Sequence, residues 1–344
     1  MRITLATLAL GALGALIARL AGAPAPLLTG PALVVTLGAL AGMRVSIPDR
    51  LRSVIFLIIG VNIGTAVTPE ALATAARWPA SLAALAAAIV ITFYGAAALL
   101  TRVQRLSPMT ALLAACPGHL SVVLSMSEEV EADMARVAVI QTLRVLALTL
   151  AVPALAALLS DRPLSAGGAP AAAMNWPVLA AILALSVAAG AFLRRLGVPA
   201  ALLLGAMAIS AALHGSGAVR AGVPGWLSGA AFVAMGTLIG TRFAGITPRM
   251  LLQSLGAAGL LTGFAALVAL AGAALVAAFL GLPLVAALIA FAPGGLETML
   301  AMSLLLDADP AFVAAHHVFR LLFLSVLLPW AVARRRRQAA DPGA

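Results

Sequence analysis

Apolar stretches of roughly 20 residues recur along nearly the whole chain, separated by short stretches that carry most of the polar residues. Stretches of this length and character are what an α-helix needs to cross the hydrocarbon core of a bilayer. An outer-membrane barrel would instead show alternating segments of about ten residues, which are absent. The pattern predicts helices near 3–20, 26–43, 53–68, 78–100 and 135–159, and again near 176–193, 199–214, 226–243, 250–280 and 312–333.

Two interruptions of the apolar pattern have the same form. Residues 116–120 read CPGHL and residues 292–296 read APGGL, so Pro117 and Pro293 are 176 positions apart (293 − 117 = 176). At the same offset Arg144 corresponds to Arg320. We therefore interpret the chain as a duplication, with membrane repeats at 1–160 and 176–333, a linker at 161–175 and a basic cytoplasmic tail at 334–344.

The segments 107–127 and 282–305, which hold the Pro-Gly pairs, decide the symmetry of the repeats. If they enter the membrane and return, each half has five spans and the second copy is inverted; if they cross, each half has six and the copies are parallel. Loop arginines favour the cytoplasmic side. The five-span arrangement places 15 arginines inside and four outside, against 12 and seven for the alternative.

The prediction is thus an all-α polytopic membrane protein of about ten transmembrane helices in two inverted five-helix repeats. Each repeat carries one broken or re-entrant Pro-Gly segment. We expect it in a bacterial cytoplasmic (inner) membrane, with both termini cytoplasmic.

Composition agrees with the membrane interpretation. Hydrophobic residues make up 63% of the chain and charged residues 9%, with a mean hydropathy of +1.14; a soluble domain has about a quarter charged residues. The net charge of +10 comes from arginines in loops and in the tail. Arginines in these places set the orientation of a membrane protein, so the charge does not indicate nucleic-acid binding. The single cysteine, Cys116, excludes an internal disulfide and a cysteine-rich metal site.

The two Pro-Gly pairs are the first candidate functional site. Proline removes a backbone donor and interrupts a helix, and lipid cannot satisfy the freed backbone groups. Such backbone must face protein or a water-filled cavity, and broken helices in inverted halves are typical of secondary transporters. The candidate binding residues here are Pro117, Gly118, His119 and Ser121 in the first half, and Pro293, Gly294, Gly295, Glu297 and Thr298 in the second.

The helix after each break carries a polar pair with i, i+3 spacing, Gln141 with Arg144 and His317 with Arg320, so each pair lies on one helix face. A guanidinium in the membrane faces a partner or an aqueous cavity, and it suits carboxylate or phosphate ligands. The alternative is an intramolecular ion pair that holds the halves together, with Asp133, Asp309 or Glu297 as the acid.

Other polar residues support fewer conclusions. Asn62 lies between Gly60 and Gly64 and could add a hydrogen bond at a helix contact, although small residues there also suit close packing. The adjacent His316 and His317 diverge by about 100° on a helix, with no third ligand at a useful spacing. We expect no metal, no cofactor and no enzymatic activity, because nucleotide and nucleophile motifs are also absent.

With the doubled segments LLAACPGHLSVVLSMSEEVEADMARVAVIQTLRVL and LIAFAPGGLETMLAMSLLLDADPAFVAAHHVFRLLFLSVLLPW in view, the chain resembles the membrane AbrB family over nearly its whole length. That family has two copies of a membrane repeat, and its members carry the labels ammonia monooxygenase or membrane regulator. Its name is shared with an unrelated soluble DNA-binding regulator, so the resemblance implies no nucleic-acid contact. His119 departs from the family's Pro-Gly-Gly, which leaves open whether both breaks function alike.

The function expected from these features is secondary transport of a small, anionic or neutral solute coupled to an ion or proton. The partners are then that solute, the coupling ion and the lipid bilayer, with a homo-oligomer left open. The alternative is a membrane protein that affects gene expression indirectly. An ammonia monooxygenase would need a redox metal, for which four histidines are thin support.

Overall fold

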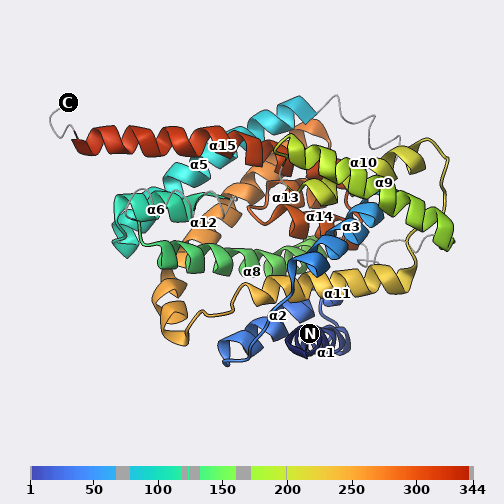
Figure 1. The fold of residues 1–344 in the computed structure, drawn as a ribbon. Coiled ribbons are helices and arrows are strands. Elements are labelled where there is room, and N and C mark those ends of the chain that lie inside the picture. Colours follow the sequence, from blue (N-terminus) through green and yellow to red (C-terminus); the bar gives the residue numbers. More distant parts are fainter. Residues whose placement is uncertain are drawn as a thin grey trace. The chain divides into compact units, whose positions relative to one another are not determined.

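All of the regular structure in the described residues is helical (Figure 1). The computed structural model describes residues 2–66, 78–117, 123, 132–159, 172–198 and 200–340. In these ranges the one extended contact is an isolated parallel bridge between Ala173 and Gly222, which is not a strand. The predicted all-α class is therefore confirmed.

Every predicted apolar stretch coincides with a helix. Polar caps and prolines mark several of the starts: Asn175 accepts a hydrogen bond from the N–H of Val178, and Thr247 accepts one from the N–H of Met250. The ten helices are α1 (Arg2–Leu20), α2 (Pro26–Leu40), α3 (Asp49–Thr65), α5 (Trp78–Gln104), α8 (Met134–Leu159), α9 (Trp176–Arg195), α10 (Ala201–Gly215), α11 (Gly225–Thr241), α12 (Pro248–Leu280) and α15 (Pro310–Ala340).

The two Pro-Gly segments form short helices. In the first, the described part is α6 (Pro108–Ala115). In the second, α13 (Leu284–Phe291) and α14 (Leu296–Leu305) lie on either side of a non-helical stretch at 292–295. The second segment is thus a broken helix, as predicted.

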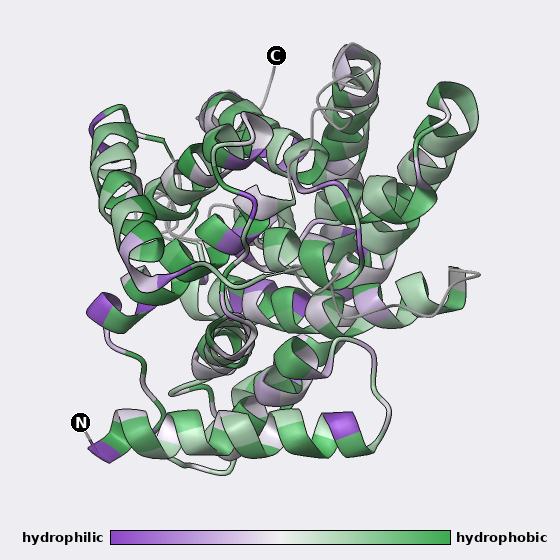
Figure 2. Ribbon diagram, turned by 90° about the vertical axis from the view of Figure 1, so that its right-hand side faces the viewer, coloured by the Kyte–Doolittle hydropathy of each residue, from purple (hydrophilic) through white to green (hydrophobic). Residues whose placement is uncertain are grey.

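Among the described residues, six helices are long and apolar enough to cross a membrane: α1, α5, α8, α9, α12 and α15. Apolar residues cover most of each helix, and α1, which begins at the end marked N, is polar mainly near its two ends (Figure 2). In α9 and α12, 22% of the residues in an 18-residue apolar stretch are buried, against 61% in α8 and 50% in α15. The chain is therefore a membrane-type helical protein in which α8 and α15 are the most enclosed spans.

The chain forms two compact units, and each draws on both halves of the sequence. Unit 1 consists of Met1–Trp78, Thr149–Gly245 and Leu296–Ala314, and unit 2 of Pro79–Leu148, Ile246–Gly295 and Ala315–Ala344. The chain therefore passes from one unit to the other several times. The repeat boundaries at 160 and 176 describe the sequence and do not separate these units.

In unit 1 the helices pack in the order α1, α2, α11, α3, α10, α9. Two glycines allow close approach of backbones: a Cβ on Gly60 would collide with the carbonyl oxygen of Leu203 in α10, and one on Gly236 with that of Leu28 in α2. Asn62 donates a hydrogen bond from its side-chain amide to Ser228 Oγ, which joins α3 to α11.

In unit 2, α5 and α12 run antiparallel. Gly95 of α5 faces the ring of Phe264, and Gly256 of α12 faces the side chain of Gln104, so residues later in α5 meet residues earlier in α12. Gly272 of α12 faces the ring of Phe291 at the end of α13. This packing places the second Pro-Gly segment against α12.

The close approach at Gly236 predicts a position-specific cost on one helix. Gly236→Ala should lower the free energy of unfolding by about 1–3 kcal/mol, because the new methyl group meets backbone that cannot rotate away. Gly229→Ala on the same helix is the matched control: its Cβ would meet one methyl group at 3.9 Å, so stability should hold or rise slightly. Thermal unfolding in detergent measures both, and equal losses would contradict the packing described here.

Candidate functional site

Both Pro-Gly segments leave the helical path at the residue before proline. Cys116, which follows α6, has φ −62° and ψ 118°, and Ala292, which follows α13, has φ −56° and ψ 129°. A residue before proline is pushed toward this extended region. The carbonyl groups of Cys116 and Ala292 therefore lose their place in the helical hydrogen-bond ladder. The N–H of Gly294 donates to the carbonyl oxygen of Ala292 at 2.8 Å, and both carbonyl groups have further donors.

Arginines supply those donors. Arg144 Nη1 donates to the carbonyl oxygen of Cys116 at 3.0 Å, and Arg320 Nη1 donates to that of Ala292 at 2.6 Å. Arg320 Nη2 also donates to the carbonyl oxygen of Gly294 at 2.6 Å. The two arginines are 2% and 1% exposed. Each guanidinium thus completes the backbone of the break in its own half of the sequence.

The polar residue three positions before each arginine contacts a backbone carbonyl group one turn earlier in the short helix. Gln141 Nε2 donates to the carbonyl oxygen of Leu113 at 3.0 Å, and His317 Nε2 lies 2.9 Å from that of Ile289. His317 Nδ1 lies 2.7 Å from Arg320 Nη2. Because a guanidinium only donates, Nδ1 must accept, and Nε2–H donates to Ile289. His317 is therefore neutral in this arrangement.

Two of the three carboxylates considered as ion-pair partners accept backbone hydrogen bonds at the starts of helices. Asp133 Oδ1 accepts from the N–H of Arg136 at the start of α8. Asp309 Oδ1 accepts from two backbone N–H groups at the start of α15. Burial raises the pKa of the Asp309 carboxyl above its ordinary value, and these two N–H groups oppose that rise. The hydrogen bonds of Arg144 and Arg320 described above go instead to carbonyl oxygens and His317.

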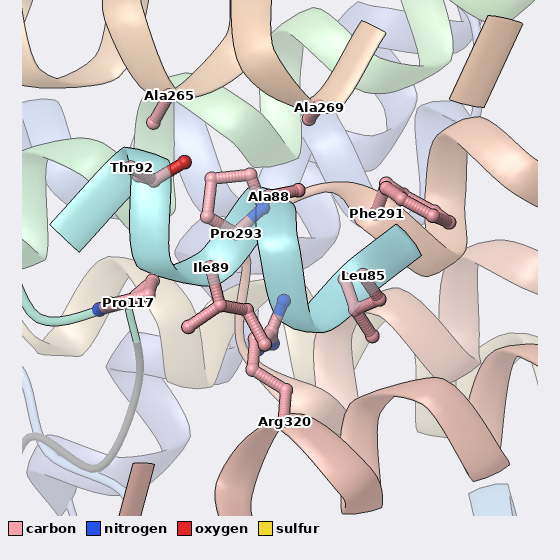
Figure 3. Close-up of a pocket in the computed structure, with 10 residues that line it drawn as sticks. All are labelled: Leu85, Ala88, Ile89, Thr92, Pro117, Ala265, Ala269, Phe291, Pro293 and Arg320. Atoms are coloured by element: carbon pink, nitrogen blue, oxygen red, sulfur yellow. The ribbon is translucent and has the colours of Figure 1, made fainter. Parts of the chain in front are cut away.

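The two prolines of the breaks line one cavity in unit 2. Pro117 and Pro293 both contribute to it, and Arg320 extends from α15 toward it (Figure 3). The rest of the lining is apolar apart from Thr92, whose hydroxyl is drawn on the cavity side of α5. The cavity therefore brings together residues of both Pro-Gly segments and a buried cation.

The predicted site residues fall into three groups. Gly118, His119 and Ser121 lie outside the described residues. Asn62, Glu297 and Thr298 belong to unit 1, where Glu297 is half-buried in the first turn of α14 and Thr298 has a buried hydroxyl without a partner among the described residues. Pro117, Gln141, Arg144, Pro293, Gly294, Gly295, His317 and Arg320 belong to unit 2.

Three participants were missed from the sequence. Cys116 and Ala292 take part through their carbonyl groups, which any residue possesses, so their side chains carry no signal. Thr92 lies in a long apolar helix with no feature that distinguishes it from a residue at a helix contact. The one usable signal for the two acceptors was their position immediately before a proline.

Comparison with known proteins places these features in a family. The profile described as "Transition state regulatory protein AbrB" matches residues 27–335. A Bacillus subtilis (strain 168) protein named "Uncharacterized protein YhjN" is 31% identical over 254 residues, which cover 67% of this chain and 64% of that protein. An Escherichia coli (strain K12) protein named "Putative regulator AbrB" is 30% identical over 325 residues, which cover 90% of each. No solved structure matches.

The contacts of His317 predict a difference between two substitutions. His317→Ala removes the acceptor for Arg320 and the donor for Ile289, and should lower the free energy of unfolding by about 1–3 kcal/mol. His317→Gln introduces the residue type that bonds Leu113 from position 141, so it should recover most of that loss. Thermal unfolding of the purified protein compares them. The interpretation fails if glutamine is as damaging as alanine.

Proposed function

The chain belongs to the AbrB family, and we propose that it is a secondary transporter that moves a small solute coupled to an ion or proton. The observation that carries this proposal is that the prolines of both breaks line one cavity of about 10 Å³, which has room for about one water molecule, beside a buried arginine. The proposal assigns no enzymatic activity to the chain.

Interrupted helices suit transport for a physical reason. Backbone at membrane depth can leave the helical path only where protein or a water-filled cavity satisfies it. Interrupted segments in corresponding positions of two halves are the sequence feature that best indicates a transporter's binding site. Here Cys116 and Ala292, in two such segments, are held by arginines on the helices that follow.

The proposal includes two inverted copies, at 1–160 and 176–333. Matching contacts support the duplication: adding 176 to both residue numbers of the Arg144–Cys116 hydrogen bond gives the Arg320–Ala292 hydrogen bond. The helix order in unit 1 supports the two copies as well. If α1, α2 and α3 are exchanged with their counterparts α9, α10 and α11, the packing order reads the same from the opposite end, as two-fold related copies require. Arginine counting favours ten crossings of the inner membrane with cytoplasmic termini.

The second candidate function is an indirect effect on gene expression. It is favoured by one observation: the family description contains the word "regulatory", and the name of the Escherichia coli relative contains the word "regulator". A membrane protein can alter transcripts by changing the level of a solute or by acting on a partner. The first route requires transport, whereas the second does not.

Flux measurements test the transporter. Purified protein in lipid vesicles, supplied with a panel of small metabolites and imposed proton or sodium gradients, should give saturable uptake of at least one solute. Arg320→Ala should reduce that uptake more than tenfold, because it removes the side-chain donors to the carbonyl groups of Ala292 and Gly294 beside the cavity. Arg52→Ala is the control, since Arg52 forms an exposed ion pair with Asp49 and should behave as wild type. Absence of saturable flux across the panel would count against transport.

Complementation separates the two functions. Deletion of the gene should change transcript levels, and wild-type protein should restore them. If regulation depends on transport, Arg320→Ala present in the membrane at wild-type abundance should leave the transcripts changed. Full restoration by that variant would instead identify a regulator that does not transport. Immunoblotting of membranes checks the abundance.

A further inference from the structure

We propose that a second cavity, between the starts of α8 and α12, binds a zwitterionic α-amino acid with an aliphatic side chain through Asp133 and Arg136. The cavity has a volume of about 400 Å³, within the roughly 300–1,000 Å³ of small-molecule sites. It lies wholly in unit 2 and shares no lining residue with the cavity beside Arg320. The proposal goes beyond transport, because binding at this site requires no flux.

The lining of this cavity carries two opposite charges that do not pair with each other. Asp133 precedes α8 and Arg136 follows three positions later, so both lie on one side of the helix start. The one ion pair in the described part of the chain is that of Arg52 with Asp49. The Nε–H of Arg136 also has no hydrogen-bond partner there. A carboxylate and a guanidinium at one cavity are therefore both available to a ligand.

Ser254 gives a second, independent indication of a ligand. It lines the cavity from α12, it is 2% exposed, and its hydroxyl has no hydrogen-bond partner among the described residues. A helical serine commonly donates to the carbonyl oxygen four residues earlier, as Ser53 and Ser325 do. A buried hydroxyl without such a bond is costly unless something else satisfies it. A polar group in the cavity would do so.

The corresponding helix start in the second half of the sequence lacks the positive charge. Asp309 and Phe312 lie 176 positions after Asp133 and Arg136. Each aspartate accepts a hydrogen bond from the N–H three positions later, at 3.0 Å in the first half and 3.3 Å in the second. Phe312, however, is 2% exposed and packs edge to face against Trp78, with ring centroids 6.2 Å apart. Capping is thus common to both halves, whereas the guanidinium is particular to the half that has this cavity.

The charges and the walls together indicate the class of ligand. A simple anion would be repelled by Asp133 and a simple cation by Arg136, so a ligand that carries both charges is favoured. A guanidinium binds a carboxylate with two parallel hydrogen bonds, and an aspartate accepts from an ammonium group. In an α-amino acid both groups are attached to one carbon. This suits two side chains whose Cβ atoms are about 5–6 Å apart.

The remaining lining accommodates the rest of such a ligand. Val139 and Met250 give apolar contact for an aliphatic side chain, and Ser254 provides a hydroxyl. Asp133 and Gln253 are exposed, so the cavity is open to water. In the proposed topology Arg136 is on the cytoplasmic side, and an amino acid from the cytoplasm would reach the site without crossing the membrane.

Equilibrium binding of radiolabelled L-leucine to the purified full-length protein in detergent tests the proposal. Wild-type protein should bind leucine saturably. Two matched ligands each lack one charge: 4-methylpentanoate is leucine without its amino group, and 3-methylbutylamine is leucine without its carboxylate. Each should compete at least about tenfold less well than unlabelled leucine, because Asp133 or Arg136 is then left without its partner.

Substitutions separate the charges from the capping role. Asp133→Asn removes the charge but keeps a good N-cap, so it should weaken leucine binding by about tenfold or more and leave the unfolding temperature unchanged. Arg136→Gln should weaken binding to a similar extent. Asp309→Asn makes the same change at the other helix start and is the matched control, which should bind leucine as the wild type does.

The proposal is overturned if leucine, valine and alanine all fail to bind saturably, or if either single-charge analogue competes as well as leucine. Wild-type affinity in both Asp133→Asn and Arg136→Gln would also overturn it. The analogues require no variant, so the test holds even if a variant does not fold. Leucine binding without flux of any solute leaves the site standing, and flux of another solute without leucine binding leaves transport standing.

Discussion

The freed carbonyl groups at the two Pro-Gly segments are the constraint on which the rest of unit 2 depends. Lipid supplies no donors, so these must come from the protein: the N–H of Gly294 provides one for Ala292, and neighbouring helices provide others. Arg144 and Arg320 provide them, which requires that α8 and α15 pass beside α6 and α13. This requirement explains why α8 and α15 are the most buried of the six long apolar helices, although their hydropathy resembles that of the others.

The hydrophobic pattern predicted the helices well because burial in lipid leaves few alternatives to a helix. Ten predicted apolar stretches became ten helices, and 292–295 is non-helical as the Pro-Gly pair indicated. The hydrophobic pattern did not determine how many of these helices cross the membrane. Helices such as α2 and α10 have 15 residues, fewer than the roughly 20 that span a bilayer, so their topology rests on the arginine count.

The sequence indicated which helix faces carry the buried polar residues, but not what those residues contact. The spacing of Gln141 and Arg144 correctly placed both on one face, which the bonds to Leu113 and Cys116 confirm. Their partners could not be deduced, because a backbone carbonyl has no residue-type signature and an acidic side chain is the more obvious partner for a guanidinium. The division into two units was equally hidden, since it depends on which helices pack together across the whole chain.

The difference between Gln141 and His317 bears on which group could carry a coupling proton. Both donate to a carbonyl group, but His317 also accepts from Arg320, so a proton on Nδ1 would break that bond and add a charge beside a guanidinium. Its neighbour His316 is placed differently: Nε2 lies 2.7 Å from Ser81 Oγ, and a hydroxyl can donate or accept. Because it accepts from Arg320, His317 holds that arginine in place and is poorly suited to carry a coupling proton.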